Sequence, residues 1–259
     1  MPRRARKKSR SGIYHVIVRG ANRQEIFHKE EDRLRFLETL KRYKIENDIE
    51  VLAWCLMDNH VHLLLKEKDK TISDLMKRLG ISYASYYNWI YGTNGHLFQD
   101  RFKSENVETN GYLATVVRYI HMNPVKAGLV RGPEEYVWSS CSNYYGKRSY
   151  PVDLLTSSLV FALFSPEKEK AQMLIKEFHE RQCDDKCLSA WGEKRVRLRD
   201  EEARGEIMEV LGDLEIPQVK SLPGRERDEV LKRVKKIEGL SQRQAARILG
   251  VSVYLVNRA

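Results

Sequence analysis

The segment spanning residues 51–65 constrains the fold more than any other part of this chain. Two apolar, β-rich runs flank a short polar stretch at residues 57–59 that is typical of a tight turn. The pattern predicts a β-hairpin in the middle of a sheet. Residues two apart on a strand point to the same face, so His60 and His62 would project together, with Val61 on the opposite face.

The two histidines of this hairpin have two interpretations. Two imidazoles side by side can hold one metal ion, because the neutral histidine nitrogen is a common metal ligand. The same spacing also fits two histidines on a half-solvated strand face. Spacing alone does not separate these alternatives.

Hydrophobic periodicity predicts the elements around the hairpin. Thr71 is an expected helix N-cap with Asp74 at the capping-box position, and Gly80 could break that helix. Pro124 is expected to end a later helix, because the residue before a proline disfavours helical backbone. These elements predict an α+β domain that has a small antiparallel sheet covered by helices and ends near residue 146. The expected elements are a strand (13–18), a helix (30–47), the hairpin, a helix (71–89), a strand (105–108) and a helix (110–122).

The charge of the chain favours a polyanionic partner such as nucleic acid. It has 46 basic and 36 acidic residues and a net charge of +10. Residues 1–12 form a basic arm that would contact phosphates, and no apolar run follows it as in a signal peptide. The basic residues of this arm are Arg3, Arg4, Arg6, Lys7, Lys8 and Arg10.

Other features of the composition point to a cytoplasmic protein without a membrane partner. The purely apolar runs are far shorter than a membrane span. Four cysteines without a secretory signal are expected to be free thiols in a reducing compartment. Three residues spaced by four would share a helix face and could ligate zinc: His179, Cys183 and Cys187. No clear fourth ligand lies nearby in the sequence.

A set of tyrosines also has two interpretations. Tyr83, Tyr87 and Tyr91 are spaced by four, and on a basic protein they would either stack against unpaired bases or pack on the sheet.

The helix before Pro124 carries a candidate nucleophile. Tyr119 and Asn123 are four apart and share a face if the last turn holds. A tyrosine phenol can attack phosphorus and form a covalent phosphotyrosine, and a metal ion would polarise the scissile phosphate. Two imidazoles and an amide oxygen would accept Mg²⁺ or Mn²⁺. The alternative is a helix-terminal tyrosine that packs on the proline.

Several blocks resemble one protein family. His60-Val61-His62 resembles the HUH motif of single-tyrosine transposases, in which U is a hydrophobic residue. Residues 119–130, YIHMNPVKAGLV, resemble the signature of the REP-associated tyrosine transposases. Residues 95–104 and 138–141 are similar to two further blocks of that family. The resemblance covers about residues 10–146, in the family's order and spacing.

The resemblance implies a fold and an activity. The fold would be the ferredoxin-like antiparallel sheet of HUH nucleases, and the reaction would be cleavage and rejoining of single-stranded DNA beside a hairpin. Tyr119 would be the nucleophile and would leave a 5′-phosphotyrosine, and a monomer is favoured over a homodimer. The implied metal ligands are His60, His62 and Asn123.

Neighbouring residues have less specific roles. His121, on another helix face, is expected to be solvated or to contact DNA rather than to bind metal. Three basic residues could meet phosphates or be ordinary surface charges: Arg101, Lys103 and Arg118.

The C-terminal part is predicted to be all-α. Residues 147–216 form a helical connecting region without a catalytic pattern, and residues 217–259 resemble a helix-turn-helix. Ser241 and Gln244 form a capping box, and Gly250 makes the turn. The last helix would bind duplex DNA; the alternative is a three-helix packing unit without DNA. Its candidate contacts are Ser252, Tyr254 and Asn257.

The sequence therefore favours a metal-dependent, DNA-cleaving tyrosine transposase with an added DNA-binding segment. The alternative is a non-catalytic DNA-binding regulator that descends from a transposase. A barrel hydrolase with an HxH motif needs repeated strand-helix units, which this pattern does not contain.

Overall fold

The computed structural model describes residues 7–147, 150–181, 187, 198, 200–237 and 239–259. The chain divides into two compact units, Met1–Ala190 and Trp191–Ala259, which we describe separately. The expected connecting region 147–216 is divided between these units: its first helices belong to the first unit and its last helix belongs to the second. Within the described residues, no helix is long and apolar enough to cross a membrane.

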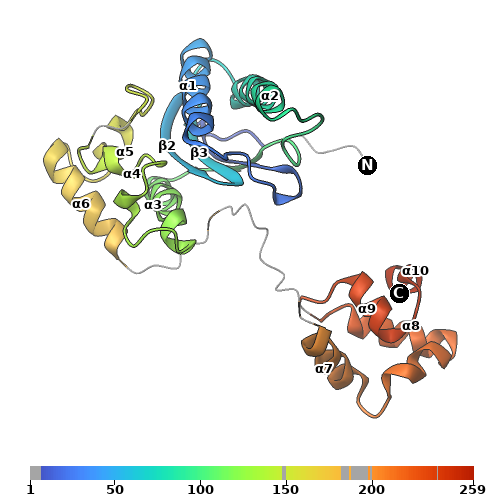
Figure 1. Cartoon of the computed structure of the whole chain (residues 1–259). Helices are drawn as coiled ribbons and strands as arrows, with labels where there is room; N and C mark the ends of the chain where they lie inside the picture. Colours follow the sequence, from blue (N-terminus) through green and yellow to red (C-terminus); the bar gives the residue numbers. More distant parts are fainter. Residues whose placement is uncertain (1–6, 148–149, 182–186, 188–197, 199, 238) are drawn as a thin grey trace. The chain divides into compact units, whose positions relative to one another are not determined.

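The first unit is built on a four-stranded antiparallel sheet, as the sequence predicts (Figure 1). The strand order is β2-β3-β1-β4, so the histidine-bearing strand β3 lies inside the sheet, between β2 and β1. The predicted α+β fold and the position of the hairpin are confirmed. The strands are β1 (Ile13–Arg19), β2 (Glu50–Met57), β3 (His60–Lys66) and β4 (Lys103–Asn106).

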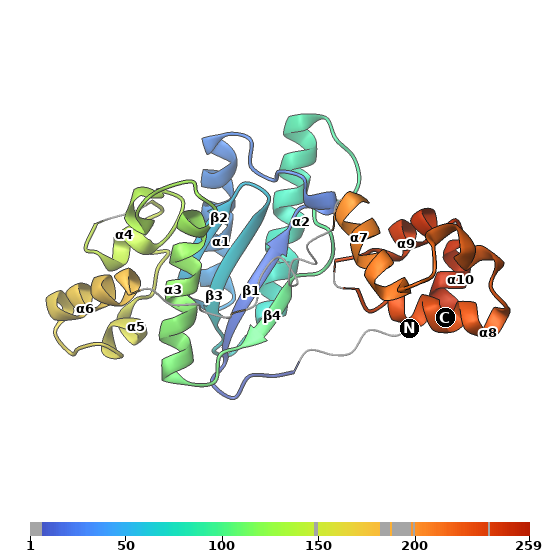
Figure 2. The same cartoon turned by 90° about the horizontal axis from the view of Figure 1, so that it is seen from below.

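Helices cover both faces of this sheet (Figures 1 and 2). Helices α1 (Glu30–Glu46) and α2 (Ile72–Tyr91) share one apolar core with Val61 and Leu63 of β3. Helix α3 (Asn110–Lys126) packs on the other face, in a second core that contains Leu64. Because side chains alternate along a strand, His60 and His62 lie on the α3 face.

Three boundaries differ from the prediction. Helix α2 runs unbroken through Gly80, and β4 is placed two residues earlier than expected. Helix α3 continues through Pro124 to Lys126, where a proline was expected to end it. Pro124 is buried, and the amide of Ala127 still donates to the carbonyl of Asn123. Burial of this face therefore offsets the one helical hydrogen bond that the proline removes.

The remainder of the first unit extends around β2 and α3. The segment at residues 138–140 runs antiparallel along the edge of β2, where the amide of Leu56 donates to the carbonyl of Trp138. Helices α5 and α6 contribute to the core under α3. The elements are η1 (Ala21–Arg23), η2 (Pro133–Glu135), α4 (Cys141–Tyr144), α5 (Ser158–Ala162) and α6 (Lys168–Glu180).

The second unit is helical and has its own apolar core. The hydroxyls of Ser241 and Ser252 accept hydrogen bonds from backbone amides at the N-termini of the last two helices, as predicted. Gly250 ends the first of these with a φ of 66°, a conformation that favours glycine. The elements are α7 (Asp200–Leu211), η3 (Ile216–Ser221), α8 (Gly224–Val234), α9 (Gln242–Leu249) and α10 (Val253–Arg258).

Candidate active site

The two strand histidines lie together beneath helix α3. Their ring centroids are 5.0 Å apart and the rings are nearly perpendicular. His62 is completely buried and His60 is almost so. The structure therefore brings the pair together on one face of the sheet, as the spacing predicts.

Hydrogen bonds orient both imidazoles through their Nδ1 atoms. The Nδ1 of His60 lies 2.7 Å from Oδ1 of Asn59, an acceptor, so this nitrogen carries the proton. The Nδ1 of His62 lies 3.0 Å from Nε2 of His15. Within the described residues, the buried Nε2 atom of His62 has no hydrogen-bond partner. A buried imidazole nitrogen without a partner is a favourable place for a cation.

Burial keeps these imidazoles neutral. It lowers the pKa of His60 to about 4, with a further contribution from the charge of Arg19. It also holds the pKa of His62 well below its usual range, helped by the neighbouring histidines. Because only neutral imidazole ligates metals, both histidines are in the binding-competent form at neutral pH.

Tyr119 lies against the histidines from helix α3. Its ring centroid is 5.7 Å from that of His62, and the Lys126 ammonium lies 5.0 Å from the ring. The side chain is 8% exposed. Burial, with smaller contributions from Cys187 and Glu105, raises the pKa of the phenol to about 12. The phenol is therefore protonated at neutral pH and must lose its proton to act as a nucleophile.

Asn123 lies one helical turn after Tyr119, at half-buried depth. Its side-chain amide nitrogen donates to the carbonyl of Tyr119 over 2.8 Å. The side-chain oxygen is the atom that remains for a ligand. This is the donor type predicted to complete a shell with His60 and His62.

The predicted phosphate contacts differ in accessibility. Arg101 and Lys103 are exposed, whereas Arg118 is buried. The guanidinium of Arg118 donates to the carbonyl of Phe178 over 3.0 Å and lies 3.9 Å from the centroid of that ring. Arg118 thus joins α3 to α6, and we leave it out of the DNA-contacting set.

The remaining candidates are partly described. In the basic arm, Arg3, Arg4 and Arg6 lie outside the described residues, and the other three side chains are exposed: Lys7, Lys8 and Arg10. In the second unit, the candidate DNA contacts are all exposed: Ser252, Tyr254 and Asn257.

The tyrosines of α2 pack within the protein. Tyr83 is fully buried and its hydroxyl donates to the carbonyl of Ile26, and Tyr87 is nearly buried. The hydroxyl of Tyr91 donates to the carboxylate of Asp32. Packing, rather than stacking on bases, explains these residues.

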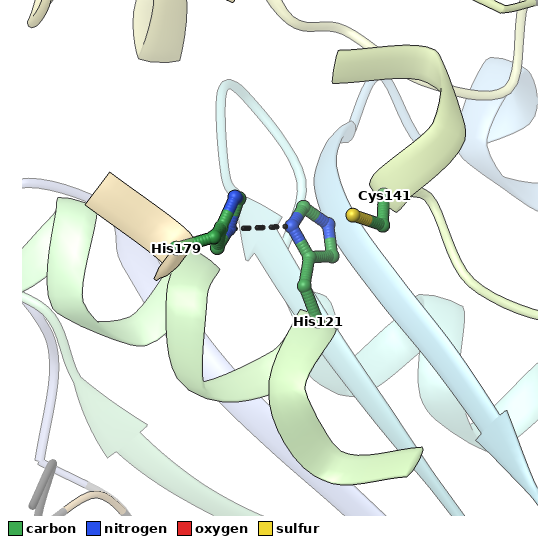
Figure 3. A group of neighbouring side chains, drawn as sticks. All are labelled: His121, Cys141 and His179. Carbon is green, nitrogen blue, oxygen red and sulfur yellow. Dashed lines mark hydrogen bonds between the residues drawn. The ribbon is translucent and has the colours of Figure 1, made fainter. Parts of the chain in front are cut away.

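His121 is buried, so the prediction that it is solvated or contacts DNA is wrong. It lies next to Cys141 and His179, residue types that can ligate metal (Figure 3). Its Nδ1 pairs with Nε2 of His179 at 3.1 Å, and its Nε2 pairs with Oγ of Ser140 at 2.8 Å. Each nitrogen of His121 is thus already hydrogen-bonded, and the group acts as a polar network that ties α3 to α6.

The predicted zinc group of His179, Cys183 and Cys187 is described only in part. His179 is the last-turn histidine of α6 and its Nδ1 pairs with the hydroxyl of Tyr145 at 3.0 Å. Cys183 lies outside the described residues. Cys187 packs with the core beneath α3.

His15 is the site residue that the sequence interpretation missed. It is completely buried, and its ring centroid lies 5.3 Å from that of His62 and 5.8 Å from that of Tyr119. The only signal was a histidine inside an alternating apolar strand. The residue that it faces depends on the pairing of β1 with β3, which the sequence alone does not give.

The fold and the site define an α+β domain in which two strand-borne histidines lie against a helix-borne tyrosine. Residues 8–123 match the family model described as "Transposase IS200 like". This part of the chain, which contains the sheet and most of α3, is therefore similar to IS200-like transposases.

Two solved structures are similar to the chain. One is a REP-associated tyrosine transposase bound to a REP hairpin: 20% identity, TM-score 0.48, covering 61% of this chain and 96% of that one. The other is a candidate transposase from Deinococcus radiodurans R1: 23% identity, TM-score 0.33, covering 46% of this chain and 95% of that one. No curated protein matches the sequence.

Proposed function

We propose that this protein is a transposase that cleaves and rejoins single-stranded DNA next to REP-like hairpins, through a covalent bond between Tyr119 and the DNA. The observation that carries the proposal is that the ring of Tyr119, on α3, packs against His62, which lies next to His60. The similarity of residues 8–123 to the model of IS200-like transposases supports DNA transposition as the biological context.

The proposed reaction is an in-line displacement at phosphorus. The Tyr119 oxygen attacks the scissile phosphate, the phenol loses its proton, and the bond from phosphorus to the 3′-oxygen breaks. The 3′-oxygen takes up a proton and leaves as a hydroxyl, while the 5′-phosphate stays on the tyrosine. Attack by a 3′-hydroxyl on this phosphotyrosine reverses the step. Because the phosphoester bond is conserved, rejoining requires no ATP.

The residues of the site fit a divalent cation such as Mg²⁺ or Mn²⁺. His60 and His62 present Nε2 atoms whose opposite nitrogens are held by hydrogen bonds, and Asn123 offers an amide oxygen. A cation held there would polarise the scissile phosphate and offset the charge that develops on its oxygens. The protein's own part is to fix the ligand geometry and to keep Tyr119 against the histidines.

Exposed basic residues supply the proposed DNA contacts. Lys103 is the first residue of β4 and Arg101 lies two residues before it. The basic arm precedes β1. These side chains would bind phosphates without reading sequence. The second unit would add contacts to duplex DNA through α10, the last helix of a helix-turn-helix-like pair.

A DNA-binding regulator on the same fold is the second candidate. It would need neither the free Nε2 of His62 nor a tyrosine beside it. The orphaned Nε2 atom favours the catalytic proposal, because a purely structural role gives no reason to bury an unpaired nitrogen.

Covalent trapping tests the proposal. The full-length protein is incubated with single-stranded hairpin DNA from the flanks of its own gene, with Mg²⁺ or Mn²⁺, and analysed on a denaturing gel. We expect a protein–DNA band in wild type and in Tyr43→Phe, a control on α1 across the sheet, but not in Tyr119→Phe.

Two results would contradict the proposal. No band on DNA that the protein demonstrably binds would favour the regulator. A band that survives in Tyr119→Phe and disappears in Tyr112→Phe would show that Tyr112 is the nucleophile.

A further inference from the structure

We infer that His15 is a positioning residue that holds His62 with its Nε2 lone pair free for the cation, and that Glu105 determines this tautomer. The inference rests on the proposed metal site but not on the cleavage reaction. His15 does not itself act as a ligand in this arrangement, because its Nε2 is engaged by His62.

Strand register places the three residues in one row. His62 on β3 lies opposite Ile17 on β1, so His15, two residues from Ile17, shares the face and is the diagonal neighbour of His62. Glu105 on β4 lies directly opposite His15. The row therefore crosses three adjacent strands on the face that α3 covers, from the interior to a carboxylate that is 36% exposed.

The hydrogen bond between the imidazoles has two possible directions. Either Nδ1–H of His62 donates to Nε2 of His15, or Nε2–H of His15 donates to Nδ1 of His62. The first direction leaves a lone pair on Nε2 of His62. The second puts a proton there and blocks that nitrogen as a ligand.

Glu105 favours the first direction. One of its carboxylate oxygens lies 4.0 Å from Nδ1 of His15. In the first direction this Nδ1 carries a proton, whose partial positive charge faces the carboxylate. In the second it carries a lone pair, which the carboxylate repels. The hydroxyl of Tyr112 also interacts with the Glu105 carboxylate.

The two nitrogens that lack partners lie at the two ends of the histidine pair. Nε2 of His62 and Nδ1 of His15 are both buried without a hydrogen-bond partner in the described part of the chain. In the inferred tautomer the first is an acceptor for a cation and the second is a donor aimed towards Glu105. One assignment thus accounts for both atoms. Carboxylate–histidine pairs behind a metal ligand act in the same way, by fixing its tautomer and raising its basicity.

The tautomer can be measured on the full-length protein without metal. Nitrogen-15 NMR of the imidazoles distinguishes Nδ1–H from Nε2–H. We expect His62 to be the Nδ1–H tautomer in wild type and in His15→Gln, because a glutamine carbonyl can replace the acceptor at Nε2. A protonated Nε2 on His62 in wild type would overturn the inference.

Cation affinity provides the second readout, by isothermal titration of Mn²⁺ into the full chain. We expect His15→Leu to weaken binding by about 10- to 100-fold, the usual effect of removing the partner of a metal-ligating histidine. His15→Gln should restore most of the affinity. Glu105→Gln should also weaken binding, but by less than His15→Leu does. The glutamine amide can donate to Nδ1 of His15 and so stabilise the wrong tautomer. Circular dichroism would verify that each variant is folded.

The outcomes separate this inference from the proposed function. Unchanged Mn²⁺ affinity in a folded His15→Leu variant would overturn the inference, even if wild type forms the covalent adduct. A glutamine variant as weak as the leucine variant would also overturn it, since packing alone would then explain His15. Wild type that binds Mn²⁺ with the expected tautomer but forms no adduct would refute the cleavage proposal alone.

Discussion

His60 and His62 owe their neutral state to burial more than to any neighbouring charge. The same burial acts in the opposite way on Tyr119, whose phenol it holds in the protonated form. At the scale of single residues, burial therefore keeps the proposed metal ligands neutral and the proposed nucleophile protonated. The attacking oxygen becomes available only as its proton is removed.

The pH dependence of cleavage should follow Tyr119. Its pKa is about 12, so at every pH well below 12 the phenolate fraction of the free enzyme increases about tenfold for each unit that the pH is raised. Under single-turnover conditions, we expect the rate of adduct formation to increase from pH 7 to pH 9. The measurement is the covalent band against time at each pH, with Mn²⁺ saturating. A rate that falls over this range would contradict the assignment of a neutral phenol.

At the scale of elements, the local patterns were sufficient for much of the fold. The alternation in β1, the hairpin and the caps of α2, α9 and α10 all depend on residues close together in the sequence, and these predictions are confirmed. The side-by-side histidines also follow from strand periodicity. Their metal role and the role of Tyr119 stay predictions.

The features that the sequence could not give depend on distant packing. His15 meets His62 only through the register of β1 and β3, 47 residues apart in the chain. Arg118 and His121 are buried because α6, a helix about 60 residues further on, packs against α3. Helix α3 also passes Pro124, a buried residue, since burial of its face outweighs a local signal.

The burial of Arg118 leads to a stability prediction. Arg118→Met should lower the free energy of unfolding of the first unit by about 1.5–3 kcal/mol, the range for hydrogen bonds to charged groups, because the carbonyl of Phe178 loses its donor. Chemical denaturation measures this change. Exposed Arg101→Met is the matched control, and we expect it to weaken DNA binding without a change in stability. Equal stability of the two variants would contradict the structural role of Arg118.

At the scale of the whole molecule, a net charge of +10 makes DNA affinity depend on salt. The triple variant Lys7→Ala, Lys8→Ala, Arg10→Ala should reduce the slope of log affinity against log salt by about 2, at ~0.7 per phosphate contact on single-stranded DNA. Fluorescence anisotropy at several salt concentrations measures the slope. The control removes three exposed charges from α6: Lys168→Ala, Lys170→Ala and Lys176→Ala. If both variants change the slope equally, the arm has no special role.

The division of the chain into two units predicts a separation of binding from chemistry. If the second unit only holds duplex DNA, then its exposed residues Tyr254 and Asn257 contribute to affinity but not to the reaction at Tyr119. The full-length double variant Tyr254→Ala, Asn257→Ala should therefore bind a hairpin with a duplex extension several-fold more weakly. Its single-turnover rate constant at saturating DNA should equal that of wild type.

The matched substrate for this test is the same hairpin without the duplex extension, for which wild type and the double variant should have equal affinity. Equal affinity for both substrates would leave the second unit without a DNA-binding role and favour a packing unit. A lower rate constant at saturation would instead mean that the second unit takes part in assembling the active site. The comparison of affinity with rate therefore decides whether the two units act in sequence, with binding before cleavage, or together.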